Sequence, residues 1–140
     1  MEDEFRRQIK SLKIDAVVRL LPPVSYTDSL KILNKYNICV IIEADLEEGV
    51  FLPSKLSDYL QSHKTILAIS PAKGCLHDDY LAGIVDYFAN VKFSDEIANE
   101  IHKIYSDYKL NSIGEKNKNL LKYSEDVIYS THVNQIFPLN

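Results

Sequence analysis

Apolar residues recur with helical spacing in four stretches of the chain. Residues 2–13 place apolar side chains three and four apart, and acidic residues fill the first turn, where the helix dipole favours them. Similar stripes predict helices over residues 26–36, from Pro53 onward, and from residue 94 to about residue 109. The last ~30 residues predict one or two further helices.

Short apolar runs between these helices predict strands. Residues 16–21 form the first run, which contains one arginine and is stopped by a proline pair that donates no ladder hydrogen bond. Residues 38–42 are mostly β-branched and continuous, which is typical of a strand buried on both faces. Residues 65–70 predict a third strand, and residues 84–93 carry a weaker strand signal.

Helices that alternate with short strands indicate βαβ units and a parallel sheet. We therefore expect one α/β domain over residues 1–140, a three-layer Rossmann-like parallel sheet with helices on both faces. Right-handed crossovers place the loops that follow the strands along one sheet edge, where open α/β sheets bind ligands. The loops 21–25, 43–53 and 70–78 are therefore the candidate site.

Composition narrows the class of protein. The chain has 140 residues, of which 26% are charged, and its net charge is −4, which argues against nucleic-acid binding. The longest apolar run, residues 38–42, is far shorter than the ~20 residues of a membrane-spanning helix. The N-terminus has no signal-peptide pattern, and two cysteines make no disulfide framework. A reduced, cytoplasmic chain is the simplest interpretation.

The helix that starts at Pro53 carries the clearest candidate chemistry. At 100° per residue, Ser54, Lys55 and Asp58 share one polar face. Free amides between about residues 50 and 55, together with a lysine, suit a phosphate, and the aspartate suits a ribose diol. An ordinary amphipathic helix with a solvated polar face and a weak Lys–Asp pair explains the same spacing.

The sequence around this helix resembles a known family. Residues 52–68 read Leu-Pro-Ser-Lys-Leu-Ser-Asp-Tyr-Leu-Gln-Ser-His-Lys-Thr-Ile-Leu-Ala. This is similar to the stretch Pro-Ser-Lys-Leu-Phe-Glu-Tyr-Leu-Ala-Ala-Gly-Lys-Pro-Ile-Leu-Ala of retaining GT-B glycosyltransferases of bacterial polysaccharide assembly. Weaker similarities at residues 23–30, 37–42 and 95–101 fall in the family's order, so that the resemblance covers about residues 14–109.

The resemblance implies donor binding for transfer from a nucleotide-diphospho sugar to a glycan or lipid-linked acceptor, with retention and without a cofactor or metal. Asp58 takes the place of the ribose-binding glutamate, and Ser54 and Lys55 lie beside the diphosphate. The turn after Leu21 takes the place of the base-binding turn. The loop that touches sugar and phosphate corresponds to Gly49, Val50 and Phe51.

The chain departs from the family pattern in several places. Asp58 is one methylene shorter than glutamate, and the glycine-lysine-proline of the family is replaced by residues 63–65. The family's second glutamate falls on Val50, two positions after Glu48, whose role is therefore open. The chain begins at what resembles a later helix, so we interpret it as the C-terminal donor-domain portion of a glycosyltransferase, and no catalytic residue is assigned. Peripheral association of the full-length protein with the inner membrane is left open.

Other interpretations remain beside this one. A sugar-nucleotide epimerase shares the fold, and a non-catalytic domain could have lost donor binding. Arg19 in its strand could meet a phosphate or pair with an acid. The acidic stretch 43–48 suits a solvated loop better than a metal site, and residues 77–79 fit a polar helix start or a sugar contact. Missing first strands would leave an unpaired sheet edge, which favours an edge-strand homodimer.

Overall fold

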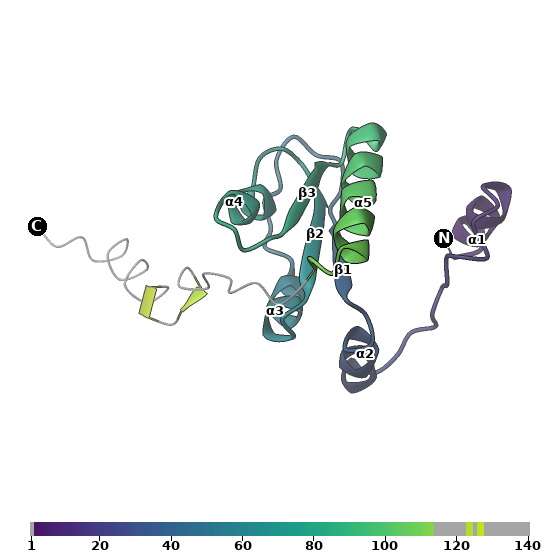
Figure 1. The fold of residues 1–140 in the computed structure, drawn as a ribbon, viewed down its shortest axis with the longest axis horizontal. Coiled ribbons are helices and arrows are strands. Elements are labelled where there is room, and N and C mark those ends of the chain that lie inside the picture. The colour runs from purple at the N-terminus through teal and green to yellow at the C-terminus, as the bar shows by residue number, and fades with distance from the viewer. Residues whose placement is uncertain (1, 114–122, 125, 128–140) are drawn as a thin grey trace, which may run out of the picture.

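A computed structural model describes residues 2–113, 123–124 and 126–127 (Figure 1). Helices and strands alternate through most of this range, as the sequence predicts. Their order is α1 (Glu2–Ser11), α2 (Tyr26–Leu33), β1 (Ile38–Ile42), α3 (Ser54–Gln61), β2 (Thr65–Ser70), α4 (Cys75–Leu81), β3 (Tyr87–Asn90) and α5 (Ser94–Lys109). No helix in the described ranges is long and apolar enough to cross a membrane.

The strands form a three-stranded sheet in the order β1-β2-β3, and both pairs are parallel. Ile38 of β1 lies opposite Thr65 of β2, and Leu67 of β2 lies opposite Tyr87 of β3. Each connection runs through a helix, α3 between β1 and β2 and α4 between β2 and β3. The predicted α/β fold with a parallel, Rossmann-like sheet is confirmed.

Helices cover both faces of the sheet (Figure 1). Every residue of β2 is buried, as expected of a central strand between two layers. On one face, Leu56 and Leu60 of α3 and Leu76 of α4 pack with Ile66 and Ala68 of β2. A second apolar cluster, on the α5 side, comprises Leu67, Ile69, Tyr87 and Ile104.

Buried polar groups join the sheet to its surroundings. The Ile66 amide donates to Asp86 Oδ2 at 2.8 Å, and the Tyr87 hydroxyl donates to Asp107 Oδ2 at 2.6 Å. Asp79 is completely buried in α4 and accepts a hydrogen bond from the Tyr123 hydroxyl. These contacts satisfy polar groups whose burial would otherwise be costly.

The predicted strand over residues 16–21 is wrong. The amides of Val17 and Val18 instead donate to the Ile14 carbonyl, at 3.0 and 2.9 Å, and so continue the chain in turns after α1. Val17 is 80% exposed, and Leu21 is 55% exposed. The apolar pattern alone does not make a strand, because the run also needs a neighbouring strand to pair with.

Other boundaries differ in smaller ways. The strand predicted over 84–93 is shorter, because the amides of Ile84 and Val85 donate to the Asp79 carbonyl before β3 begins. The segment 77–79 lies in α4, which confirms the helical interpretation. The helices expected in the last ~30 residues lie largely outside the described residues.

Candidate functional site

Two of the three candidate loops meet at the edge of the sheet where the strands end. An isolated parallel bridge joins Gly49 to Gly74, and the Gly49 amide donates to the Lys73 carbonyl at 2.8 Å. Loops 43–53 and 70–78 are therefore tied together, as the parallel topology predicts. The same hydrogen bond occupies the Gly49 amide, so this amide does not point free at a ligand.

A carboxylate and a hydroxyl lie beneath this bridge. The sequence analysis considered Glu43 only as part of the acidic stretch 43–48, and it did not single out Ser70. Glu43 directly follows β1, and its Oε2 accepts a hydrogen bond of 2.5 Å from the hydroxyl of buried Ser70 at the end of β2. A Cβ at Gly49 would lie 2.7 Å from the same carboxylate oxygen. Their positions in the sequence could have identified them, because each residue lies at the end of one of two adjacent parallel strands.

Helix α3 begins immediately after this loop. Pro53 is its N-cap, and the Leu56 amide donates to the Pro53 carbonyl at 3.0 Å. The helix-terminal amides that face outward are therefore those of Ser54 and Lys55, fewer than the run from about residue 50 that the sequence predicts. Leu56 is buried and Lys55 is exposed, so the predicted division of α3 into an apolar and a polar side is confirmed.

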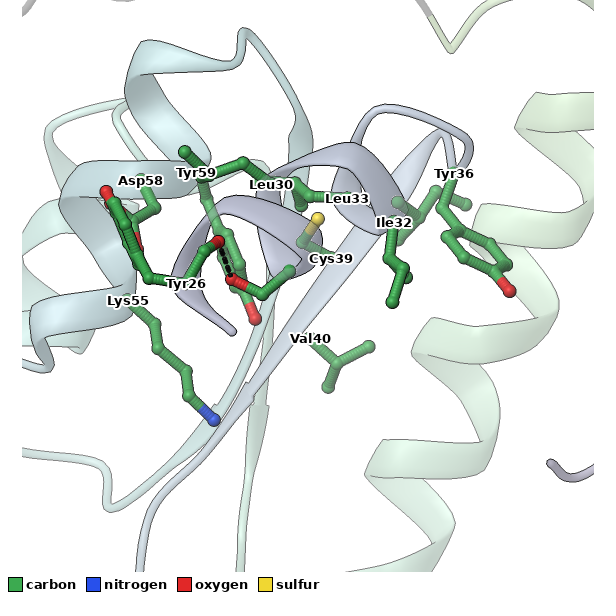
Figure 2. A pocket seen from close by; sticks show the side chains of 12 residues that line it. Tyr26, Leu30, Ile32, Leu33, Tyr36, Cys39, Val40, Lys55, Asp58 and Tyr59 are labelled. Atoms are coloured by element: carbon green, nitrogen blue, oxygen red, sulfur yellow. Dashed lines mark hydrogen bonds between the residues drawn. The ribbon is translucent and has the colours of Figure 1, made fainter. Parts of the chain in front are cut away.

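Asp58 is held by a residue from another helix. The Tyr26 hydroxyl, from the first turn of α2, donates to Asp58 Oδ1 at 2.9 Å. This hydrogen bond and the negative charge of Asp58 raise the pKa of Tyr26. In Figure 2 the Tyr26 hydroxyl lies at Asp58, whereas Lys55 extends away from that carboxylate. The sequence spacing suggested an ion pair between Lys55 and Asp58. In the structure Asp58 instead accepts a hydrogen bond from Tyr26.

The Tyr26–Asp58 contact lies at a cavity of about 500 Å³ between α2, β1 and α3 (Figure 2). Apolar side chains make up most of its lining, including Leu30, Ile32, Leu33, Cys39, Val40 and Tyr59. Its polar and charged groups include those of Lys55, Asp58, Tyr26 and Ser29. The cavity is a half-open, largely apolar hollow on the surface with a few polar groups at its side.

The remaining predicted residues lie elsewhere. Val50 and Phe51 are 62% and 77% exposed, and Glu48 is also exposed. Arg19 lies in the exposed segment that precedes α2, and not in a strand. The structure therefore brings Lys55 and Asp58 to the cavity and Gly49 to the neighbouring bridge, but it leaves Arg19 outside this group.

The acidic loop and the histidine segment have structural contacts of their own. Asp45 lies 3.9 Å from Lys92, both on the surface. No group of three or more His, Cys, Asp or Glu side chains in the described ranges could hold a metal ion. The His77 ring packs edge-on against Phe88 at 5.0 Å. Since Asp79 is buried against Tyr123, it contributes to the core and not to a surface contact with a ligand.

Comparison of the chain with protein-family models, with curated proteins and with solved structures found no match. The interpretation of the site therefore depends on its own geometry and on the resemblance of residues 14–109.

Proposed function

We propose that this chain binds the nucleoside diphosphate of a nucleotide-diphospho sugar, as the C-terminal donor-binding portion of a retaining GT-B glycosyltransferase. One observation carries the proposal. Lys55 and the hydrogen-bonded pair Tyr26–Asp58 line the same largely apolar cavity, beside the first residues of β1 and next to α3. Open α/β sheets bind nucleotides beyond the carboxyl ends of their strands, and Lys55, near the start of α3, is the lining residue that lies toward that end.

Each group has a role that its chemistry suits. The Asp58 carboxylate accepts hydrogen bonds from the ribose diol, and Tyr26 orients that carboxylate by its existing 2.9 Å bond. Lys55 and the helix-terminal amides of Ser54 and Lys55 offset the charge of the diphosphate. The exposed residues Val50 and Phe51, which follow buried Gly49, are directed to the sugar.

The chemistry of transfer follows from these roles. The bond between the anomeric carbon and the diphosphate breaks, and negative charge grows on the leaving diphosphate. Lys55 and the α3 amides stabilise that charge most strongly in the transition state. The glycan or lipid-linked acceptor binds outside this site, on a separate acceptor domain of the full-length enzyme. No residue of this chain is assigned as a catalytic base.

Isothermal titration with uridine and guanosine diphosphates tests the proposal. Asp58→Asn should weaken binding of the preferred nucleotide by about ten- to a hundredfold, because it removes charge-assisted hydrogen bonds. Asp95→Asn, an acid-to-amide change in the first turn of α5 and outside the cavity lining, should leave binding unchanged. If neither nucleotide binds, or if both variants bind as the parent does, the donor site is elsewhere or absent.

A non-catalytic domain that has lost donor binding is the second candidate. Two observations favour it: Tyr26 already occupies an oxygen of Asp58, and the Lys73 carbonyl already occupies the Gly49 amide. Tyr26→Phe distinguishes the two. It should weaken nucleotide binding if the pair forms the ribose site, and it should leave the protein equally unable to bind if the site is lost.

A further inference from the structure

β1 is an unprotected edge strand. Among the strands that the structure describes it pairs only with β2, so no described strand lies along its other edge. Its sequence ICVII contains no charge and no proline, the features that usually prevent edge strands from pairing with other chains. On the α5 side of the sheet, Val40 and Ile42 are 43% and 70% exposed. Both the edge and one face of β1 are therefore open.

The cavity runs along this open edge. It is lined by both Cys39 and Val40, consecutive residues that point to opposite faces of β1. It is also lined by Leu30 and Leu33 of α2, a helix without a buried residue. α2 therefore presents apolar side chains to an empty space beside β1, which is where a further strand of the sheet would lie.

The segment before α2 buries Ile9 but exposes several other apolar side chains. We call residues 2–25 the arm. Within it, Val17 and Leu21 are 80% and 55% exposed, and the α1 region exposes Phe5 and Leu12 by 48% and 67%. Figure 1 shows α1 standing apart from the sheet, on the far side of α5. The run 16–21 retains the β-branched and apolar pattern of a strand.

We propose that a second copy of this chain covers these surfaces, by reciprocal exchange of arms. Residues 16–21 of each copy add to β1 of the other as a fourth strand next to α2, and α1 covers the face formed by Val40 and Ile42. Each copy carries both the open edge and the strand that fits it. A two-fold exchange therefore satisfies both surfaces at once and closes the assembly.

The direction of the arm favours a second copy over the chain's own β1. The arm leads away from the sheet (Figure 1), and Pro22 and Pro23 fix the backbone φ angle near −65° in the connection to α2. The run 16–21, whose first residues are in turns, therefore lies away from its own edge strand and becomes a strand only on exchange. The added strand would lie in the same cavity that the proposed function gives to the nucleoside diphosphate, so strand and nucleotide compete for this space and the exchange is tested without nucleotide.

Light scattering and sedimentation of the full chain, without nucleotide, test the exchange. At micromolar concentration the mass should be twice 16.0 kDa. Val17→Asp should raise the dimer dissociation constant by ~100-fold or more, because the interface would bury an unpaired carboxylate. Leu81→Asp is the control, since Leu81 is 70% exposed on α4 and outside the interface. A dimer that survives Val17→Asp overturns the proposal.

A competing peptide gives a second measurement that needs no folded variant. A synthetic peptide of residues 14–23 in excess should convert the dimer to monomers, because it occupies the β1 edge. Hydrogen exchange should show protection of residues 16–21 that disappears on dilution. A monomer in which these amides are protected at every concentration means that the arm folds on its own chain, and a monomer without protection means that nothing covers the edge. Either result overturns the proposal.

Discussion

The backbone at Gly74 lets the two loops of the candidate site approach each other closely. Its φ is +123°, and a Cβ there would lie 2.2 Å from the Gly49 carbonyl oxygen. Gly83 also has a positive φ, +73°, but a Cβ there would meet nothing within 4 Å. Gly74 therefore combines steric overlap with a backbone conformation that is essentially restricted to glycine, whereas Gly83 has a positive φ without overlap.

We predict that Gly74→Ala lowers the free energy of unfolding more than Gly83→Ala does. Backbone strain costs of the order of 1–3 kcal/mol at either position, and overlap with Gly49 adds to it only at Gly74. Urea denaturation of both variants measures the difference. Equal losses would mean that the close approach of the two loops does not contribute to stability.

Tyr87 predicts how stability changes at alkaline pH. Burial, followed by its hydrogen bond to Asp107, raises the pKa of Tyr87 above its ordinary value of about 10. As the pH rises past 10, the unfolded chain therefore loses this proton first, and the free energy of unfolding falls. Below that pH the contribution is fully present.

The matched test compares Tyr87→Phe with Tyr105→Phe, which changes a tyrosine that is 57% exposed. Denaturation between pH 8 and about 11 should show a shallower alkaline decline for Tyr87→Phe than for the parent. The Tyr105→Phe curve should keep the parent slope. If stability declined with pH at the same slope in all three proteins, the raised pKa of Tyr87 would not be the cause of the decline.

At the scale of elements, local patterns predicted most of the fold. The strand β2 and the apolar side of α3 follow from side-chain periodicity, which burial of Leu56 and Leu60 confirms. The Tyr26–Asp58 contact could not be predicted in this way, because 32 residues separate its partners. The strand prediction for residues 16–21 was wrong for a related reason. Whether this run forms a strand depends on a partner strand that no local pattern specifies.

Helix α2 gives a prediction at this scale. The Ser25 hydroxyl accepts a hydrogen bond from the Asp28 amide at 3.1 Å and so caps α2. Ser25→Ala should destabilise the helix by about 1 kcal/mol. Since α2 buries no residue, hydrogen exchange should rise in α2 while β2 stays protected.

Ser57→Ala, an exposed change within α3, is the control for this capping effect. It should leave exchange in α2 at the parent rate. A Ser25→Ala variant with unchanged exchange in α2 would show that the cap does not hold the helix in place.

At the scale of the whole molecule, the proposed function assigns binding of the nucleotide donor to this chain but does not assign sugar transfer to this chain alone. Under this proposal the acceptor would be bound by a second domain. We therefore predict that the 140-residue chain binds a nucleoside diphosphate but transfers no sugar. Incubation with nucleotide-diphospho sugars and analysis of released nucleoside diphosphate measures this, and turnover by the purified chain would contradict the division of roles.

The most direct test of the donor-site claim is a nuclear magnetic resonance titration of the labelled chain with uridine and guanosine diphosphates. The account predicts saturable shifts for one nucleotide, confined to residues 49–58 and to Tyr26, and their loss in Asp58→Asn with the spectrum otherwise folded. Shifts that map to another part of the chain, or a spectrum that neither nucleotide changes, would contradict it.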